Sequence, residues 1–209
     1  MPKAAPFEEH TERYEGWFEE HEDAYRSELD ALRRLLPAPG YGIEIGVGSA
    51  RFAAPLGMQV GLDPAGEMLE YARERGIDVV KGVAEHLPFK DETFDTALIV
   101  TTICFVDDIP QTLAEAERIL EPSGSLVIGY IDKNSPVGEI YQETKEANPF
   151  YREAVFVSTE ELVDALETAG FTEFEFVQTI YHWLDEIDGP EPIENGYGDG
   201  SFVGIRATR

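Results

Sequence analysis

Two glycines that follow a short apolar stretch could hold a nucleotide-like ligand against bare backbone. Gly46 and Gly48 come directly after Ile43 and Ile45, whose branched side chains favour a β-strand. Glycine has no Cβ and reaches backbone angles that other residues avoid, so the N–H groups of such a turn can point at a ligand. Glu44, beside the turn, adds a negative charge that suits a cationic ligand and would repel a pyrophosphate.

A carboxylate at the end of the next predicted strand, residues 58–62, fits the ribose of such a ligand. Asp63 stands 17 residues after Gly46. Because ligands of open parallel sheets bind beyond the carboxyl ends of the strands, both residues should face one site. The two oxygens of Asp63 can accept both hydroxyls of a ribose diol. Glu85 adds a second acid at the same edge, in the loop 82–89.

The glycine turn departs from the pattern of NAD-binding proteins. That pattern places glycines at the first, third and sixth positions, whereas Arg51 occupies the sixth position here. The helix that follows, predicted over residues 49–54 with Ser49 as its N-cap, is cut short by Pro55. The residues therefore favour a cationic adenosyl ligand, with an NAD-type oxidoreductase and a non-catalytic cofactor-binding protein as the alternatives.

The elements that must position these residues alternate between strand and helix. This alternation predicts a three-layer, Rossmann-like, doubly wound α/β fold with a mostly parallel seven-stranded sheet and an antiparallel last strand. Ser158 and Glu161 have the spacing of a capping box at the start of the last helix. The predicted strands cover residues 41–46, 58–62, 77–80, 96–100, 125–131, 171–181 and 201–206, and the predicted core helices cover 49–54, 66–75, 110–120 and 159–169.

The ends of the chain complete a single predicted domain over residues 1–209. Residues 1–36 should form an N-terminal helical lid and a packing helix, over 8–20 and 23–36, because apolar residues recur there at helical spacing. Residues 41–131 form the predicted ligand-binding core. Residues 132–209 form the predicted substrate-side connections, among them a long connection over 132–157, and the terminal strands.

The composition of the chain limits the kinds of molecule that it can bind. The 209 residues carry a net charge of −26, which disfavours nucleic acid and anionic membrane surfaces as partners and suits a small neutral or cationic molecule. A single cysteine, Cys104, excludes an internal disulfide, and we find neither a signal peptide nor an apolar run long enough to span a membrane. We expect a cytoplasmic monomer or homodimer that holds no metal.

Four segments in one frame resemble the successive motifs of class I S-adenosylmethionine-dependent methyltransferases, and most closely the UbiE/methyltransferase-11-like subgroup. These segments are residues 44–53, 61–69, 82–89 and 116–126. The resemblance implies S-adenosyl-L-methionine as cofactor and S-adenosyl-L-homocysteine as product. It implies methyl transfer to a small-molecule acceptor by in-line displacement.

The resemblance also implies which residues hold the methionine end of the cofactor. Gly46 and Gly48 would let the methionine and ribose portion lie on backbone, and Glu44 would hold its ammonium group directly or through water. Thr101 would lie beneath the methionine end, and Tyr14 would close over it from the N-terminal lid.

Five further residues would hold the adenosine end by the same resemblance. Asp63 would bind the ribose diol, and Pro64 and Met68 would flank the adenine. The backbone of Ala84 and the side chain of Glu85 would read the adenine edge.

Two positions depart from the family's motifs, and no catalytic residue is assigned. Ala50 stands where the family has a third glycine, which fits if this residue is already helical. Val83 replaces an aspartate, for which Glu85 is our substitute. A general base is needed only if the acceptor arrives protonated. The candidates are three residues, Tyr141, Tyr151 and His182, together with the acids of the connections 132–157 and 185–200.

Overall fold

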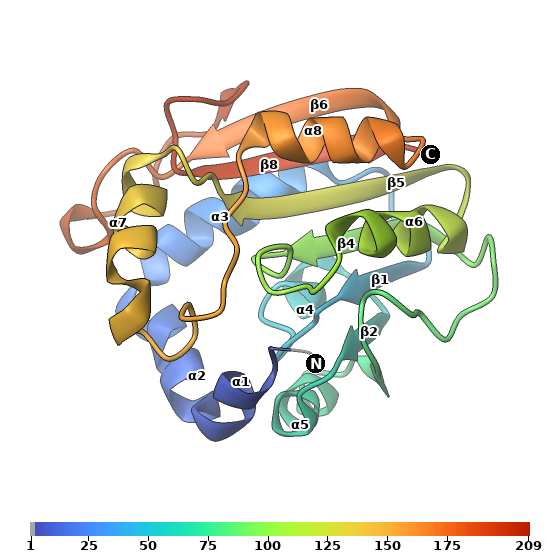
Figure 1. The fold of residues 1–209 in the computed structure, drawn as a ribbon, viewed down its shortest axis with the longest axis horizontal. Coiled ribbons are helices and arrows are strands. Elements are labelled where there is room, and N and C mark those ends of the chain that lie inside the picture. The colour runs from blue at the N-terminus through green and yellow to red at the C-terminus, as the bar shows by residue number, and fades with distance from the viewer. Residues whose placement is uncertain (1–2) are drawn as a thin grey trace.

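The computed structural model describes residues 3–209 and contains one eight-stranded sheet with the order β3-β2-β1-β4-β5-β8-β6-β7 (Figure 1). The first five strands are parallel, whereas β8 runs antiparallel to both of its neighbours. The strands are β1 (Gly42–Ile45), β2 (Val60–Asp63), β3 (Asp78–Lys81), β4 (Phe94–Val100), β5 (Leu120–Ile131), β6 (Thr172–Thr179), β7 (Glu194–Asn195) and β8 (Phe202–Thr208).

The predicted Rossmann-like α/β fold is confirmed, including its antiparallel last strand. The sheet exceeds the seven predicted strands only by β7, a two-residue strand that pairs with β6. It lies in the Gly- and Pro-rich segment 185–200, whose composition gives no strand signal.

Helices cover both faces of the sheet because its central strands are apolar on both sides. In β4, Ala97 and Ile99 face a core with α6 and α8, whereas Leu98 and Val100 face a core with α3, α4 and α5. Figure 1 shows α6 and α8 in front of the sheet and α3 behind it. The helices are α1 (Ala5–Glu9), α2 (Thr11–Glu20), α3 (Glu22–Leu35), α4 (Ala53–Leu56), α5 (Gly66–Glu74), α6 (Ile109–Ile119), α7 (Pro136–Thr144) and α8 (Thr159–Thr168), with short 3-10 helices η1 (Lys145–Ala147) and η2 (Leu184–Glu186).

The prediction of a helix over residues 49–54 is wrong about where the helix begins. The helix α4 begins at Ala53, its N-cap is Phe52, and Pro55 lies inside it. Ser49 is not an N-cap but a fully buried turn residue, and its hydroxyl has no hydrogen-bond partner among the described residues. Ala50 has a φ of 65°, so it is left-handed and not helical as we expected. The turn therefore keeps the backbone shape of a third glycine even though alanine occupies the position.

The connection over 132–157 contains the helix α7, which the sequence analysis missed. Ser135 caps it by accepting a hydrogen bond from the Gly138 amide (3.1 Å), and Pro136 occupies its first turn. The capping box predicted for α8 is present, since the Ser158 hydroxyl accepts from the Glu161 amide and the Glu161 carboxylate accepts from the Ser158 amide.

Candidate active site

A cavity of about 460 Å³ opens at the carboxyl ends of β1, β2 and β4. Its cover comes from α1, α2, α7 and residues 148–151, which approach that edge from outside the sheet (Figure 1). All predicted cofactor residues except Glu44 line it: Tyr14, Gly46, Gly48, Asp63, Pro64, Met68, Ala84, Glu85 and Thr101. The fold thus brings together residues that are up to 87 positions apart, counted from Tyr14 to Thr101.

The two glycines of the turn are required for different reasons. Gly46 has a φ of 76°, and a Cβ at this position would lie 2.2 Å from a carbon of the Thr102 side chain. The Thr102 hydroxyl donates to the Gly46 carbonyl (3.1 Å), so the turn and the end of β4 are packed directly together. Gly48 has a φ of 50° and faces the cavity, where its Cβ would lie 3.5 Å from the Tyr14 hydroxyl. Only Gly48 therefore leaves space on the ligand side.

Two backbone amides, one from the glycine turn and one from the start of α5, hold the Asp63 carboxylate in place. One carboxylate oxygen accepts from the Gly48 amide (2.9 Å) and the other from the Ala65 amide (2.8 Å). Burial raises the pKa of Asp63, although these two hydrogen bonds act in the opposite direction. Each carboxylate oxygen has a further lone pair for a ligand hydroxyl.

Glu44 lies behind the turn, 1% exposed, and one of its carboxylate oxygens has no partner among residues 3–209. Its pKa is raised well above the ordinary value by burial and by the nearby Asp63, against one hydrogen bond from the Ala53 amide. Glu44 therefore supports the start of α4 and leaves one buried acceptor unsatisfied. Such a group favours the arrival of a positive charge nearby.

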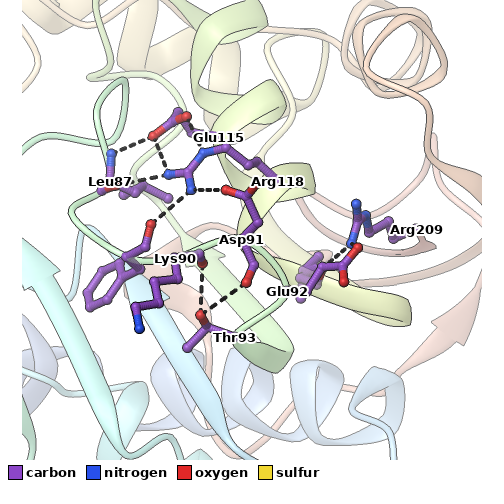
Figure 2. Close-up of polar contacts among 10 residues, drawn as sticks. Leu87, Lys90, Asp91, Glu92, Thr93, Glu115, Arg118 and Arg209 are labelled. Atoms are coloured by element: carbon purple, nitrogen blue, oxygen red, sulfur yellow. Dashed lines mark hydrogen bonds and ion pairs between the residues drawn. The ribbon is translucent and has the colours of Figure 1, made fainter.

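A network around Arg118 holds the loop that carries Ala84 and Glu85 (Figure 2). The guanidinium donates to the backbone carbonyls of Leu87 (3.0 Å) and Phe89 (2.8 Å) and pairs with Glu115 (2.8 Å). The Glu115 carboxylate in turn accepts from the Leu87 amide (2.7 Å). The loop is thereby fixed to α6.

The adenosine-side residues occupy positions that suit their predicted roles and also serve the fold. Glu85 lines the cavity, and one of its oxygens accepts from the amides of Asp107 (2.7 Å) and Asp108 (3.3 Å). Met68 is nearly fully buried while also lining the cavity. Recognition of the adenine edge by Glu85 stays a prediction.

Thr101, at the cavity wall, has a strained backbone conformation. Its φ is 48°, which is unusual for a β-branched residue, and its amide donates to the Gly129 carbonyl (2.7 Å). Strained residues of this kind concentrate at functional sites when surrounding structure holds them. This supports the predicted place of Thr101 at the ligand.

Contacts of two glutamates tie the N-terminal segment over the cavity. Glu15 of α2 pairs with Arg51 (2.6 Å) and with Arg75, which lie after the glycine turn and after α5. Glu8 of α1 accepts from the Gly66 amide (2.7 Å). Tyr14 lies between these anchors and faces Gly48 across the cavity. The segment is thus placed as a cover of the cavity.

The sequence and the fold of this chain are similar to those of known proteins. The methyltransferase-domain family matches residues 43–128. An uncharacterized protein of Methanocaldococcus jannaschii is 41% identical over 97% of this chain and 98% of its own length. A crystal structure from Thermotoga maritima, described as a SAM-dependent methyltransferase and possible histamine N-methyltransferase, superposes with a TM-score of 0.95. It is 51% identical and covers 98% of both chains.

The chain belongs to the class I S-adenosylmethionine-dependent methyltransferases. The ubiquinone/menaquinone C-methyltransferase UbiE of Bartonella tribocorum is 42% identical over 30% of this chain and 27% of its own length, which agrees with the predicted subgroup. The cofactor of this methyltransferase is S-adenosylmethionine. Membership of this family favours a protein that binds S-adenosylmethionine over an NAD-type oxidoreductase. The unsatisfied Glu44 oxygen, the open side of Gly48 and the fixed Asp63 fit such a cofactor.

The methyltransferase site contains one buried acid that the sequence analysis missed. Glu28 of α3 lines the cavity although it is only 3% exposed. Its signal was present in the sequence, because a glutamate interrupts the apolar stripe of Tyr25, Leu29 and Leu32 on one helix face.

The three candidate bases separate in the structure. Tyr141 and Tyr151 line the cavity of the methyltransferase. His182 is exposed, pairs with Glu191 and is not among the lining residues. Within residues 3–209 there is no cluster of potential metal ligands, and no helix is long and apolar enough to cross a membrane.

Proposed function

We propose that this methyltransferase moves the methyl group of S-adenosylmethionine to a small-molecule acceptor bound in the same cavity. The observation that carries the proposal is the continuity of that cavity. The glycine turn and Asp63 line one part, and aromatic side chains from the covering elements, including Trp17, Tyr141 and Tyr151, line the rest. The volume of about 460 Å³ is that of a small-molecule pocket.

The residues of the chain would bind and align the reactants. Asp63 would accept the ribose hydroxyls, and Glu44 would attract the ammonium group from behind the turn. The cofactor supplies a methyl group that is already activated by a positively charged sulfur. The protein therefore mainly has to orient the acceptor and exclude water, which the aromatic cover does.

An amine nitrogen is the acceptor atom that the surroundings favour. The net charge of −26 attracts cations and repels anionic acceptors. The Thermotoga maritima protein, 51% identical, is described as a possible histamine N-methyltransferase. Both observations support an amine over a carboxylate.

Binding experiments with two probes test the cofactor half of the proposal. S-adenosylhomocysteine carries the ammonium group, whereas 5′-methylthioadenosine has the adenosine part without the amino acid. We expect Glu44→Gln to weaken binding of the first about tenfold and to leave the second unchanged, because only the first has a charge for Glu44 to meet. Equal effects on both probes would contradict this role.

Turnover with a radiolabelled methyl group tests the acceptor half. A panel of small amines, imidazoles, phenols and carboxylates is incubated with the cofactor, and labelled product is counted. We expect labelling within the amines or imidazoles. Tight S-adenosylhomocysteine binding without labelling of any panel member would instead support a non-catalytic cofactor-binding protein.

A further inference from the structure

Glu28 of α3 is a buried acid that lines the cavity and has no partner among the described residues. It lines the cavity at 3% exposure, and its carboxylate makes no hydrogen bond or ion pair within residues 3–209. Burial raises its pKa to about 8. A charged acid this deeply buried, with no hydrogen bond to the protein, is costly to the fold, so a ligand in the cavity that supplies the contact is the natural explanation for it.

The surroundings of Glu28 are aromatic. Tyr141 and Tyr151 stack with their ring centres 4.7 Å apart, and Tyr14 packs edge-on against Phe18 at 5.1 Å. Burial, with a contribution from the Glu28 charge, raises the pKa of all three tyrosines, to about 12 for Tyr141. These tyrosines therefore stay neutral, and their ring faces can contact a cation.

The basic side chains at the cavity are engaged elsewhere. Lys3 donates to the Val106 carbonyl (3.2 Å), the Arg13 guanidinium lies 5.8 Å from the Phe150 ring centre, and the His21 ring packs against Trp17. None of these side chains pairs with Glu28 in the described part of the chain. The carboxylate is therefore available to a positive charge that enters from outside.

We propose that Glu28 anchors the methyl acceptor, by binding an N–H group of a cationic amine or imidazolium, and that it accepts the proton which this nitrogen must lose. The inference rests on the proposed function, since it places an acceptor in the cavity. It adds a residue and a charge to that function: the acceptor enters as a cation into a cavity that Tyr141 and Tyr151 also line.

An ammonium acceptor loses one proton to Glu28 before it takes the methyl group. The N–H bond breaks, its electron pair stays on nitrogen, and the proton joins a carboxylate oxygen of Glu28. The freed pair forms the new N–C bond, while the pair of the broken S–C bond stays on sulfur. The methylated ammonium product carries one positive charge, and neutral Glu28 has a weaker hold on it.

Calorimetry on the protein loaded with S-adenosylhomocysteine tests the anchor without turnover. The probes are benzylamine and histamine, with benzyl alcohol and benzoate as the neutral and anionic counterparts of benzylamine. We expect at least one amine to bind at least tenfold more tightly than benzyl alcohol. Since burial raises the pKa of Glu28 to about 8, cation binding at pH 7 should release protons, up to about one per site, measured in buffers of different ionisation enthalpy.

Two variants assign the effect to this side chain. Glu28→Gln keeps the size of the side chain and should abolish both the proton release and the preference for the amine. Glu19→Gln removes an exposed acid of α2 that does not line the cavity, and it should behave as the unmodified protein. The melting temperature of each variant confirms that it is folded.

The outcomes separate this inference from the proposed function. If S-adenosylhomocysteine binds but neither amine binds more tightly than benzyl alcohol, the role of Glu28 is overturned and the cofactor site stands. If an amine binds with equal proton release in Glu28→Gln, the inference is also overturned. Failure of S-adenosylhomocysteine to bind at all would overturn the proposed function itself.

Discussion

Replacing Glu28 by glutamine should make the ligand-free protein more stable, by an amount that depends on pH. Glu28 is buried and has a pKa of about 8, against an ordinary value of 4.5. Above pH 4.5 the unfolded chain releases this proton while the folded chain keeps it. The unfolded state therefore binds fewer protons, and the stability of the unmodified protein falls as pH rises.

The size of this effect follows from the two pKa values. Each pH unit between 4.5 and about 8 costs the folded state about 1.4 kcal/mol, which accumulates to about 5 kcal/mol at and above pH 8. Glu28→Gln has no proton to lose there. Its advantage should be near zero below pH 4.5 and about 5 kcal/mol at pH 9, equivalent to about 10 °C or more in melting temperature for a chain of this size.

Unfolding in urea at pH 5, 7 and 9 measures this difference for the unmodified protein, Glu28→Gln and the exposed control Glu19→Gln. Glu44 and Asp63 also have raised pKa values, but they are present in all three proteins and their contribution cancels in the comparison. Tyr14, which faces Glu28, has a raised pKa and stays neutral over this range. A stability difference that is constant from pH 5 to pH 9 would refute the burial of an unpaired acid at position 28.

Three further substitutions probe the site. Asp63→Ala should weaken S-adenosylhomocysteine binding at least tenfold by calorimetry, since it removes charge-assisted hydrogen bonds worth over about 1.4 kcal/mol. Gly46→Ala should lower the free energy of unfolding by over about 2 kcal/mol in urea, because its Cβ would lie 2.2 Å from Thr102. Glu15→Gln should speed amide hydrogen exchange across residues 11–20, because it weakens two ion pairs that hold α2.

For each of these tests one result would contradict the prediction, and two of the tests have a matched control variant. Gly76→Ala has the same backbone strain, with a φ of 85°, but no atom within 4 Å of the added Cβ. Equal destabilisation at both glycines would therefore contradict the steric argument. Glu12→Gln, on the exposed face of α2, should leave hydrogen exchange unchanged. Unchanged S-adenosylhomocysteine affinity in Asp63→Ala would remove the ribose assignment.

The meeting of the predicted cofactor residues at one cavity could be predicted from sequence because its determinants are local. Gly46, Gly48 and Asp63 each stand at the end of a short apolar strand, and neighbouring parallel strands bring such ends to one edge. The order of the first strands along the chain was enough to place these residues together. No knowledge of side-chain packing was needed.

The errors at the turn and at Glu28 arise from contacts between residues that are distant in the chain. Ser49 has the composition of an N-cap, but close packing within the core leaves it in a turn, and Ala50 takes the left-handed conformation there. The helix α7 was missed even though its start signals, Ser135 and Pro136, are local, because the whole segment 132–157 was interpreted as a connection. Glu28 was missed because its significance depends on elements over 100 residues away in the chain, including Tyr141.

The placement of one short segment over the whole cavity has a consequence for the kinetics of turnover. Residues of α1 and α2, among them Phe7 and Tyr14, line this cavity, and Glu15 fastens α2 to Arg51 and Arg75. Displacing this segment exposes both ligands at once, so the exchange of cofactor product and of methylated acceptor shares one barrier. Added salt, which weakens those ion pairs, should then accelerate the release of both products together.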